Sequence, residues 1–318
     1  MDLRLIDRQT NMASSSYLRP FPTPPSLTPV MKEDGECITW ADLPSDLTSS
    51  ILRRLGSIDI FENAQRVCTS WRGVCKDPEM WRKIDMRNLG DVGFNLEIMC
   101  RHAVDRSQGG LVDIEIWHFA TDSLLNYIAD SSSNLRSLKL VKCSPLTSEG
   151  LTEAIVKLPL LEELDVSYCS LSVESLKVVG QSLPNLKTLK LNRIYRRFAC
   201  RPYVSDDDAL AIAETMPRLS HLQLFANKLT STGLNAILDN CPNLEHLDLR
   251  MCLNVTLLGD LKKRCSERIK VLIRPFDSFL DHPHDEAAIL TDSSDDHYND
   301  YYEDDDDSYD NDDVYGSF

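Results

Sequence analysis

The chain has 318 residues, with 50 acidic and 34 basic side chains and a formal net charge of −16. Residues 281–318 hold 15 Asp and Glu and no Lys or Arg, which leaves 35 acidic against 34 basic residues in positions 1–280. Since nucleic acid binding needs a basic surface and this body is almost neutral, we expect no nucleic-acid partner. No apolar run approaches the ~20 residues that a membrane-spanning helix needs, so we also expect no membrane span.

Ten cysteines are scattered along the chain, and none of them forms a CxxC pair. No Cys/His cluster has the spacing of a zinc site, so we expect neither a metal nor another cofactor. Cysteines at apolar positions without a pairing pattern are typical of a reducing compartment, which favours the cytoplasm, the nucleus or both. The N-terminus has no apolar signal-peptide core, so secretion is not expected.

Residues 1–36 form the first region, a Pro/Ser-rich tail that we predict to be disordered. It contains Ser14–Ser16 and a proline-rich run over Pro20–Pro25, which offer little apolar surface to bury. A ligand for a proline-binding domain is an alternative to a plain linker.

Residues 40–81 read as two short amphipathic helices. Ser45 lies where an N-cap would begin the first helix, and Gly56 where a left-handed cap would close it. The apolar face of the first helix comprises Leu47, Ile51, Leu52 and Leu55. The second helix, which ends before Pro78, has its apolar face at Ile60, Ala64, Val67, Cys68 and Trp71. About forty residues cannot bury two such faces against each other, so we expect an apolar partner surface.

The order LP-x-x-L-x-x-x-IL-x-x-L, then VC-x-x-WR and finally WR, resembles the F-box. The resemblance implies a small helical F-box over residues 37–86 that binds a Skp adaptor. The family positions that meet this adaptor are matched by Leu43, Pro44, Leu47, Ile51, Leu52, Leu55, Val67, Cys68 and Trp71. We expect Leu43, Pro44 and Ile51 to be the anchors. The alternative is that some of these side chains hold the F-box to its own repeats, and it applies most to Trp71 and to Trp81.

Beyond this stretch the signature L-x-x-L-x-L recurs about every 25 residues, a period typical of leucine-rich repeats. Clear copies start at Leu135, Leu161, Leu186, Leu219 and Leu244, and weaker ones at Leu111 and Ile269. Helical segments lie between the copies, and four of them end at a proline that cannot continue a helix: Pro159, Pro184, Pro217 and Pro242. We therefore predict an α/β solenoid with a seven-stranded parallel sheet and helices on its convex side. The segment 96–110 would supply the first helix.

A cysteine or asparagine follows several predicted strands by three residues, at Cys143, Cys169, Asn227 and Cys252. Together with the pairs Thr147…Gly150 and Thr230…Gly233, this resembles the cysteine-containing leucine-rich repeats that accompany F-boxes. We place the repeats at residues 87–275 and a disordered acidic tail at 276–318. The whole chain resembles a plant F-box/leucine-rich-repeat protein. That family implies a substrate receptor of a Skp–cullin–F-box ubiquitin ligase, joined through the Skp adaptor to a cullin–RING ligase.

Catalytic chemistry is not visible in the sequence. No GxSxG, HExxH, GxGxxG or P-loop occurs, and the cysteines of the repeats fall on positions expected to be buried. We therefore predict a non-catalytic adaptor with an unknown protein substrate. Two alternatives stay open: a Skp-binding scaffold that joins no cullin, and an enzyme or small-molecule-responsive receptor of the same architecture.

The concave face of the sheet is the expected substrate surface, because the third, fifth and seventh positions of each L-x-x-L-x-L-x copy point outward. The fifth positions carry alternating charges, which we interpret as structural. Among the seventh positions, Trp117, Phe225 and Arg250 are our candidates for substrate contact, unless flanking loops cover them. The longer loop after Lys190 adds Arg196 and Arg197, which could bind an acidic or phosphorylated substrate or the acidic tail, or could simply be solvated.

Overall fold

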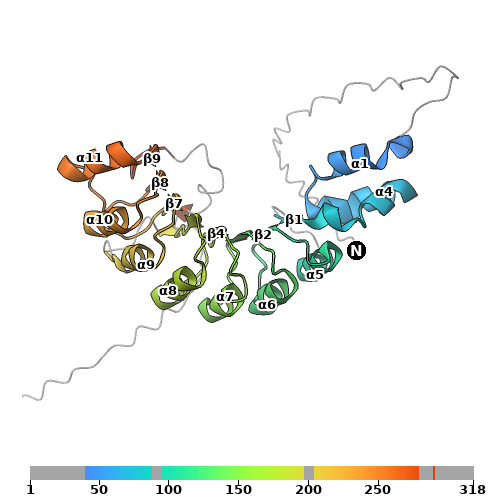
Figure 1. Ribbon diagram of the computed structural model, residues 1–318, viewed down its shortest axis with the longest axis horizontal. Helices are drawn as coiled ribbons and strands as arrows, with labels where there is room; N and C mark the ends of the chain where they lie inside the picture. The colour runs from blue at the N-terminus through green and yellow to red at the C-terminus, as the bar shows by residue number, and fades with distance from the viewer. Residues whose placement is uncertain (1–39, 88–94, 197–203, 279–288, 291–318) are drawn as a thin grey trace, which may run out of the picture.

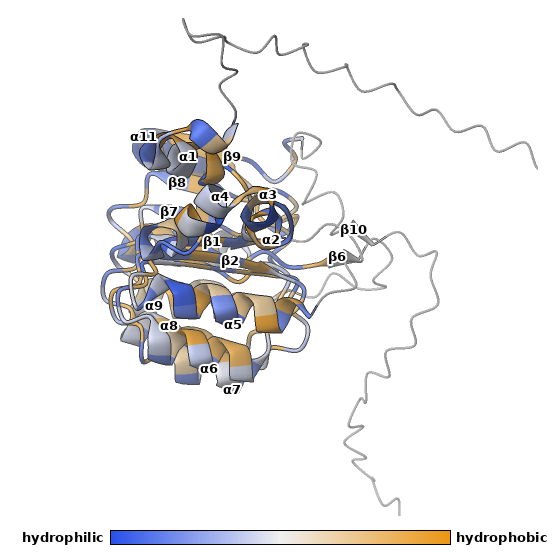
Figure 2. Ribbon diagram, turned by 90° about the vertical axis from the view of Figure 1, so that its right-hand side faces the viewer, coloured by the Kyte–Doolittle hydropathy of each residue, from blue (hydrophilic) through white to orange (hydrophobic). Residues whose placement is uncertain are grey.

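The computed structural model describes residues 40–87, 95–196, 204–278 and 289–290 (Figure 1). A small helical unit comes first, and a curved α/β solenoid follows it. All eight strands of the main sheet are parallel, in the order β1-β2-β3-β4-β5-β7-β8-β9. Figure 2 shows helices α5 to α9 together on one side of this sheet, so its other side forms the concave face. The predicted fold class is confirmed.

The strands of the main sheet are β1 (Lys83–Met86), β2 (Asp113–Trp117), β3 (Ser137–Val141), β4 (Glu163–Asp165), β5 (Thr188–Lys190), β7 (His221–Gln223), β8 (His246–Asp248) and β9 (Val271–Ile273). Leu138, Leu164 and Leu189 lie side by side in register and are fully buried, which stacks the signature leucines into one core. The sheet has one strand more than predicted. β1 lacks the leucine signature, but Ile84 and Met86 alternate into the core as the signature leucines do.

The helices of the solenoid are α5 (Leu96–Ser107), α6 (Asp122–Ser131), α7 (Ser148–Ile155), α8 (Val173–Ser182), α9 (Asp207–Thr215), α10 (Ser231–Asn240) and α11 (Gly259–Arg268). Each turns an apolar stripe toward the sheet: in α6, for example, Leu124, Leu125 and Ile128 are fully buried. α5 lies within the segment predicted for the first helix.

The cysteine that follows β3, β4 and β8 has a structural reason. The residue before it takes a left-handed backbone, as at Lys142 (φ 55°) and Tyr168 (φ 60°), and this turns the chain sharply off the sheet. The buried thiol then reaches back to the preceding strand: the Sγ of Cys169 lies 3.4 Å from the carbonyl oxygen of Leu140. Cys252 makes the same contact with Leu224 at 2.7 Å. These cysteines therefore join neighbouring repeats as weak hydrogen-bond donors.

The Thr…Gly pairs also join neighbouring repeats. Thr147 caps α7, and the carboxylate of Asp122 in the preceding repeat accepts from both its backbone N and its hydroxyl at 2.8 Å. This carboxylate lies so close to Gly150 that a Cβ there would fall 2.1 Å from it, so only glycine fits. Asp206, Thr230 and Gly233 repeat the arrangement between α9 and α10.

The helical unit consists of η1 (Trp40–Asp42), α1 (Ser45–Leu52), α2 (Ser57–Asp59), η2 (Ile60–Ala64), α3 (Gln65–Val67), α4 (Thr69–Val74) and η3 (Pro78–Trp81). Three predictions are wrong in detail. Ser45 is the first helical residue rather than the cap, because Pro44 precedes the helix. Gly56 is extended (φ −65°, ψ 156°) and leads into α2, and α1 has already ended at Leu52. The second predicted helix breaks at Cys68, whose extended backbone begins α4.

The contact between the helical unit and the first repeat, hereafter the seam, is apolar with one half-buried cation. Trp81 is fully buried, and its ring lies 4.8 Å from that of Phe61. Arg106 of α5 places its guanidinium over both rings, at 4.6 Å from Phe61 and 5.2 Å from Trp81. Such a stack of cation and rings fixes the helical unit to the solenoid.

The last described residues return to the middle of the solenoid. β10 (Ile289–Leu290) pairs in parallel with β6 (Tyr195–Arg196), just after β5, and Figure 2 shows this pair beyond the edge of the main sheet. The predicted N-terminal tail, residues 197–203 of the long loop and most of the acidic tail lie outside the described residues. The proposed domain boundaries stay predictions.

Candidate interaction surfaces

The first surface is the outer side of α1. Thr48 and Leu52, one turn apart, face inward and are fully buried. Leu47 and Ile51 face outward and are 51% and 38% exposed. An eight-residue helix with apolar side chains on both sides is suited to lie between its own unit and a second protein.

The other predicted adaptor contacts vary in accessibility. Pro44 is exposed, Leu55 and Val67 are 40% and 56% exposed, and Leu43 is half-buried. The prediction is wrong for Leu52, because its side chain has no exposed surface and fills the core of the helical unit. Trp40, at 55% exposed, is an apolar residue beside this surface that the sequence pattern missed, because it precedes the signature. We name Pro44, Leu47, Ile51, Leu55 and Val67 the α1 surface.

Cys68 and Trp71 serve the helical unit itself. The Sγ of Cys68 accepts from the backbone N of Trp71 at 3.4 Å and so caps α4. The indole of Trp71 packs against the main core and donates from Nε1 to the carbonyl oxygen of Trp40 at 3.2 Å. Both side chains are half-buried, so each can offer a partner only an edge. Trp81 lies fully buried in the seam. This agrees with the alternative that it holds the helical unit to the repeats.

The second surface is a hollow of about 480 Å³ on the concave face, hereafter the concave hollow. It runs from Arg87 after β1 to Ile273 in β9, so every strand of the main sheet except β1 contributes a lining residue. Leu189, Leu222 and Leu247 form its floor from adjacent strands, and the third- and fifth-position side chains form its walls.

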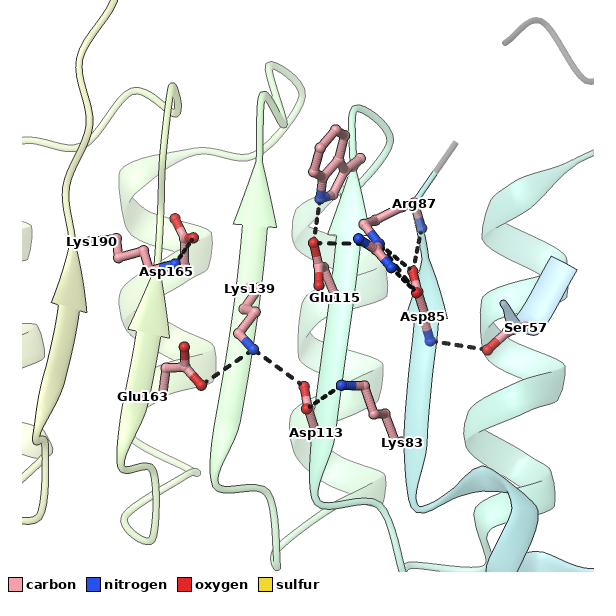
Figure 3. A network of polar contacts seen from close by, with 11 residues as sticks. Ser57, Lys83, Asp85, Arg87, Asp113, Glu115, Lys139, Glu163, Asp165 and Lys190 are labelled. Carbon is pink, nitrogen blue, oxygen red and sulfur yellow. Dashed lines mark hydrogen bonds and ion pairs between the residues drawn. The ribbon is translucent and has the colours of Figure 1, made fainter. Parts of the chain in front are cut away.

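An ion-pair ladder covers the N-terminal half of the concave face, as Figure 3 shows. Lys139 lies between Asp113 (3.9 Å) and Glu163 (3.3 Å), and Lys83 also contacts Asp113 at 3.2 Å. The predicted pairing of charges across strands is therefore present. However, Lys139 pairs with third-position acids rather than with the fifth-position acids beside it. Burial opposes the charge of Lys139, but the two carboxylates prevail and raise its pKa.

Arg87 ends this ladder next to the seam. Its guanidinium binds the carboxylate of Asp85 at 2.6 Å and approaches Glu115 at 3.8 Å. Burial of Asp85 acts against ionisation, yet the hydrogen bonds and charge of Arg87 lower the pKa of Asp85 below its usual value. On β4 and β5, Asp165 and Lys190 continue the ladder at 3.8 Å.

The C-terminal half of the concave face has a different chemistry. At the third positions Thr188, His221, His246 and Val271 follow one another across β5, β7, β8 and β9. The rings of His221 and His246 stack at 4.0 Å with an angle of 12° between their planes. Burial and the neighbouring imidazole lower the pKa of His221, which favours the neutral ring. The third positions of this half therefore offer a partly aromatic platform.

With these surfaces described, comparison with known proteins identifies the family. The F-box-like family model matches residues 40–87. F-box protein SKIP19 of Arabidopsis thaliana is 65% identical over 259 residues, which cover 80% of this chain and 83% of that protein. F-box/LRR-repeat protein 22 of the same plant is 51% identical over 96% of this chain and 98% of its own length. The chain belongs to the plant F-box/leucine-rich-repeat proteins.

Among solved structures, the yeast Rad7 and Elc1 complex aligns with a TM-score of 0.45 and 16% identity, over 62% of this chain and 58% of that one. The helical unit described above is the F-box of this chain, and the solenoid carries its leucine-rich repeats.

The predicted substrate residues of this F-box/leucine-rich-repeat protein are less accessible than expected. Trp117 is 7% exposed and Phe225 is fully buried, because both belong to a second apolar cluster with Val141 and Tyr168 at the carboxyl ends of the strands. Arg250 is 2% exposed. The prediction that these three side chains stand exposed on the concave face is therefore wrong.

Two of the three still reach the concave hollow. Trp117 and Arg250 line it, whereas Phe225 does not. The indole Nε1 of Trp117 donates to Glu115 at 2.8 Å, and Arg250 forms a two-pronged contact with Asp248 at 2.6–3.0 Å. These partners fix both side chains in the wall of the hollow. The sequence had not singled out His221 and His246, although a histidine at the same position of two successive repeats was the available signal.

The basic loop can be placed only in part. Arg196 lies in β6, and Arg197 lies outside the described residues. Arg193, which precedes β6, contacts Asp208 of α9 at 3.0 Å and so stabilises the repeat.

Metal and membrane sites were also sought in the described part of the chain. Within residues 40–87, 95–196 and 204–278, no cluster of three or more His, Cys, Asp or Glu side chains could hold a metal ion. No described helix combines the length and apolar character needed to cross a bilayer. Burial raises the pKa of the Cys100 and Cys252 thiols to about 12 each, so these two cysteines are poor nucleophiles.

Proposed function

We propose that this protein is the substrate-recognition adaptor of a Skp–cullin–F-box ubiquitin ligase. In this proposal the α1 surface binds a Skp adaptor, and the concave hollow holds a protein substrate for ubiquitylation and degradation. The observation that carries the proposal is the exposed apolar face of α1, with Leu47 and Ile51 on the outside of a helix whose inner side is already buried. The F-box-like match and the F-box relatives support it.

The α1 surface has the composition of the centre of an interface. A stable protein–protein contact buries ~1,200–2,000 Å² in total, and a few large apolar side chains carry most of its binding energy. Leu47, Ile51 and Pro44 are such side chains, and Leu43 adds a half-buried edge. We retain Leu43, Pro44 and Ile51 as anchors and add Leu47 because of its exposure, and we remove Leu52 from the wider set of adaptor contacts.

The test measures binding of purified full-length protein to a purified Skp adaptor. Leu47→Ala with Ile51→Ala should weaken binding at least about a hundredfold, since each anchor contributes on the order of 1.5–2 kcal/mol and 1.4 kcal/mol is tenfold. The matched control is Ile98→Ala with Val156→Ala, two side chains of the repeats that are 50% and 60% exposed. This control should bind like the wild type. Equal loss in both double variants, or no binding by the wild type, contradicts the proposal.

A second experiment separates the ligase adaptor from its alternatives. Capture of the protein from plant cells should recover both the Skp adaptor and a cullin, and the Leu47/Ile51 double variant should lose both. Recovery of the Skp adaptor without any cullin favours the scaffold. Binding of a substrate only when a small molecule is added favours the receptor. In all three cases the chain itself is proposed to be non-catalytic.

The compartment in which the protein works and the residues that contact its substrate are also proposals. We propose the cytoplasm, the nucleus or both, because a ubiquitin-ligase adaptor works there and the described cysteines are free thiols. We propose that the substrate contacts Trp117, Arg250, His221 and His246, which line the concave hollow. Arg196 and Arg197 keep the sequence-based proposal of a contact with an acidic substrate.

A further inference from the structure

A second hollow lies at the seam, and its lining is strongly basic. It has a volume of about 520 Å³ and is formed by the turn after α1, the starts of α2 and η2, and η3 and β1 with the residues next to them. Its charged lining comprises five cationic and two acidic side chains: Arg53, Arg54, Arg82, Lys83, Arg87, Glu79 and Asp85. We call it the seam hollow. Because residues 1–280 are nearly neutral as a whole, this excess of positive charge is local.

Two of the cations are uncompensated. Arg82 contacts Glu79 at 3.4 Å, Lys83 contacts Asp113 at 3.2 Å, and Arg87 contacts Asp85 at 2.6 Å. Arg53 and Arg54 are exposed and form no ion pair with any described residue. Their fork-shaped guanidinium groups can each bind one carboxylate through two hydrogen bonds.

The fold holds these two arginines at the seam. Their backbone N–H groups bond to the carbonyls of Ser49 and Ile51, which closes the last turn of α1. Directly after them, the hydroxyl of Ser57 accepts from the backbone N of Asp85 at 3.0 Å and so ties the turn to β1 (Figure 3). Both arginines are exposed and line the hollow.

The chain itself carries a segment of opposite charge. The acidic tail from Thr291 to Phe318 holds 12 Asp and Glu and no Lys or Arg. The tail begins directly after β10, and β10 pairs with β6 next to β5. The tail therefore starts nearer to the seam hollow than it would if it started at the last repeat. From β5 to β1 is four strand spacings of ~4.8 Å, or about 19 Å, whereas 28 extended residues can span roughly 90 Å.

We propose that the acidic tail of this chain docks in the seam hollow through Arg53 and Arg54. Tethering makes the contact intramolecular, with an effective concentration in the millimolar range, so even a weak contact is well populated. Arg87 lines both the seam hollow and the concave hollow. A tail docked in the seam hollow would therefore lie next to the concave hollow. The proposal concerns the isolated chain and does not depend on the adaptor role.

The experiment uses a fluorescent peptide of residues 291–318 and measures its anisotropy with two forms of the protein at low salt. The form that ends at Leu290 should bind the peptide, and the full chain should bind it at least fivefold more weakly because its own tail occupies the site. Arg53→Glu with Arg54→Glu, in the shortened form, should reduce the affinity at least tenfold. Unchanged thermal unfolding will confirm that this variant is folded.

The matched control is Lys262→Glu with Lys263→Glu, which makes the same change of charge on the exposed side of α11 in the last repeat. It should change the affinity less than about twofold. Equal losses in both double variants would mean non-specific attraction and would overturn the proposal. Equal binding of the peptide by the full-length and shortened chains would also overturn it. So would a peptide that fails to bind, if Arg53→Glu with Arg54→Glu nevertheless weakens capture of a Skp adaptor or an acidic substrate.

Discussion

The F-box and the leucine-rich repeats treat the same kind of side chain in opposite ways. In the repeats Leu138, Leu164 and Leu189 are fully buried, because each strand stacks on the next. In the F-box Leu47 and Ile51 stay 51% and 38% exposed, although they belong to an equally regular pattern. A regular apolar pattern thus has two outcomes. A repeat completes its own core, whereas a short helical unit leaves one face for another protein.

The largest expected effect comes from deleting a repeat leucine. Leu138→Ala should lower the free energy of unfolding by about 3 kcal/mol, because it removes a fully buried side chain between two neighbouring strands. Leu47→Ala should lower it by less than about 0.5 kcal/mol, since the side chain is half in solvent. Urea unfolding of both variants measures the contrast. Equal losses would place Leu47 in the core and end the distinction between the two regions.

The next effect concerns the seam that joins them. Arg106→Ala removes the guanidinium over Phe61 and Trp81 and should cost about 1–2 kcal/mol. Arg106→Met should recover part of this, because burial already lowers the pKa of Arg106 and its apolar stem does much of the packing. The control is Arg101→Ala on the same helix, whose guanidinium lies over Tyr127 at a more exposed site. If Arg101→Ala costs as much, the seam has no special part in stability.

Sequence periodicity predicted the solenoid well because its determinants are local. A leucine at every signature position must be buried by stacking, whatever lies far away in the chain, and the prolines end the helices wherever they occur. β1 escaped detection for the same reason: Ile84 and Met86 provide burial without leucine, so the strand has no signature. The Thr147–Gly150 spacing was visible, but its cause, a carboxylate from Asp122 in the preceding repeat, is a tertiary contact.

The interaction sites were harder to predict, because accessibility depends on neighbours. Alternation of side chains along a strand correctly directed Trp117 toward the concave side. It could not show that Val141 and Tyr168 from neighbouring repeats would pack with Trp117 and Phe225 in one buried cluster. Leu52 was misassigned in the same way: on a short helix, a shift of one residue separates the buried side from the exposed side. The basic seam hollow combines residues about thirty positions apart, which no local pattern reveals.

A smaller effect will measure how each repeat holds the next. Thr147→Ala should cost about 1–2 kcal/mol, since it removes both the cap of α7 and the hydroxyl that Asp122 binds. Thr152→Ala is the matched control, because within the described residues its hydroxyl bonds only to the carbonyl of Glu149 in the same helix. It should be neutral to within about 0.5 kcal/mol. Similar losses for the two threonines would mean that the contact with Asp122 adds nothing.

The smallest effect lies at the end of the ion-pair ladder, where the F-box meets the concave face. Arg87 lowers the pKa of Asp85 in the folded state, so the ionised carboxylate stabilises the fold above the ordinary aspartate pKa near 3.9. This contribution is lost as the pH falls through the lower folded-state value. Asp85→Asn should therefore lower the free energy of unfolding by less than about 1 kcal/mol at pH 6, since the pair is partly exposed.

The difference between wild type and Asp85→Asn should be constant above about pH 5 and should shrink below about pH 4. Urea unfolding at several pH values measures it. Glu153→Gln provides the control, because Glu153 is exposed and forms no ion pair with a described residue. A difference for Asp85→Asn that stays the same down to pH 3 would show that the hydrogen-bond geometry, rather than the charge, fixes Arg87. The ladder would then position Arg87 between the two hollows through hydrogen bonds, and it would not make the free energy of unfolding depend on pH.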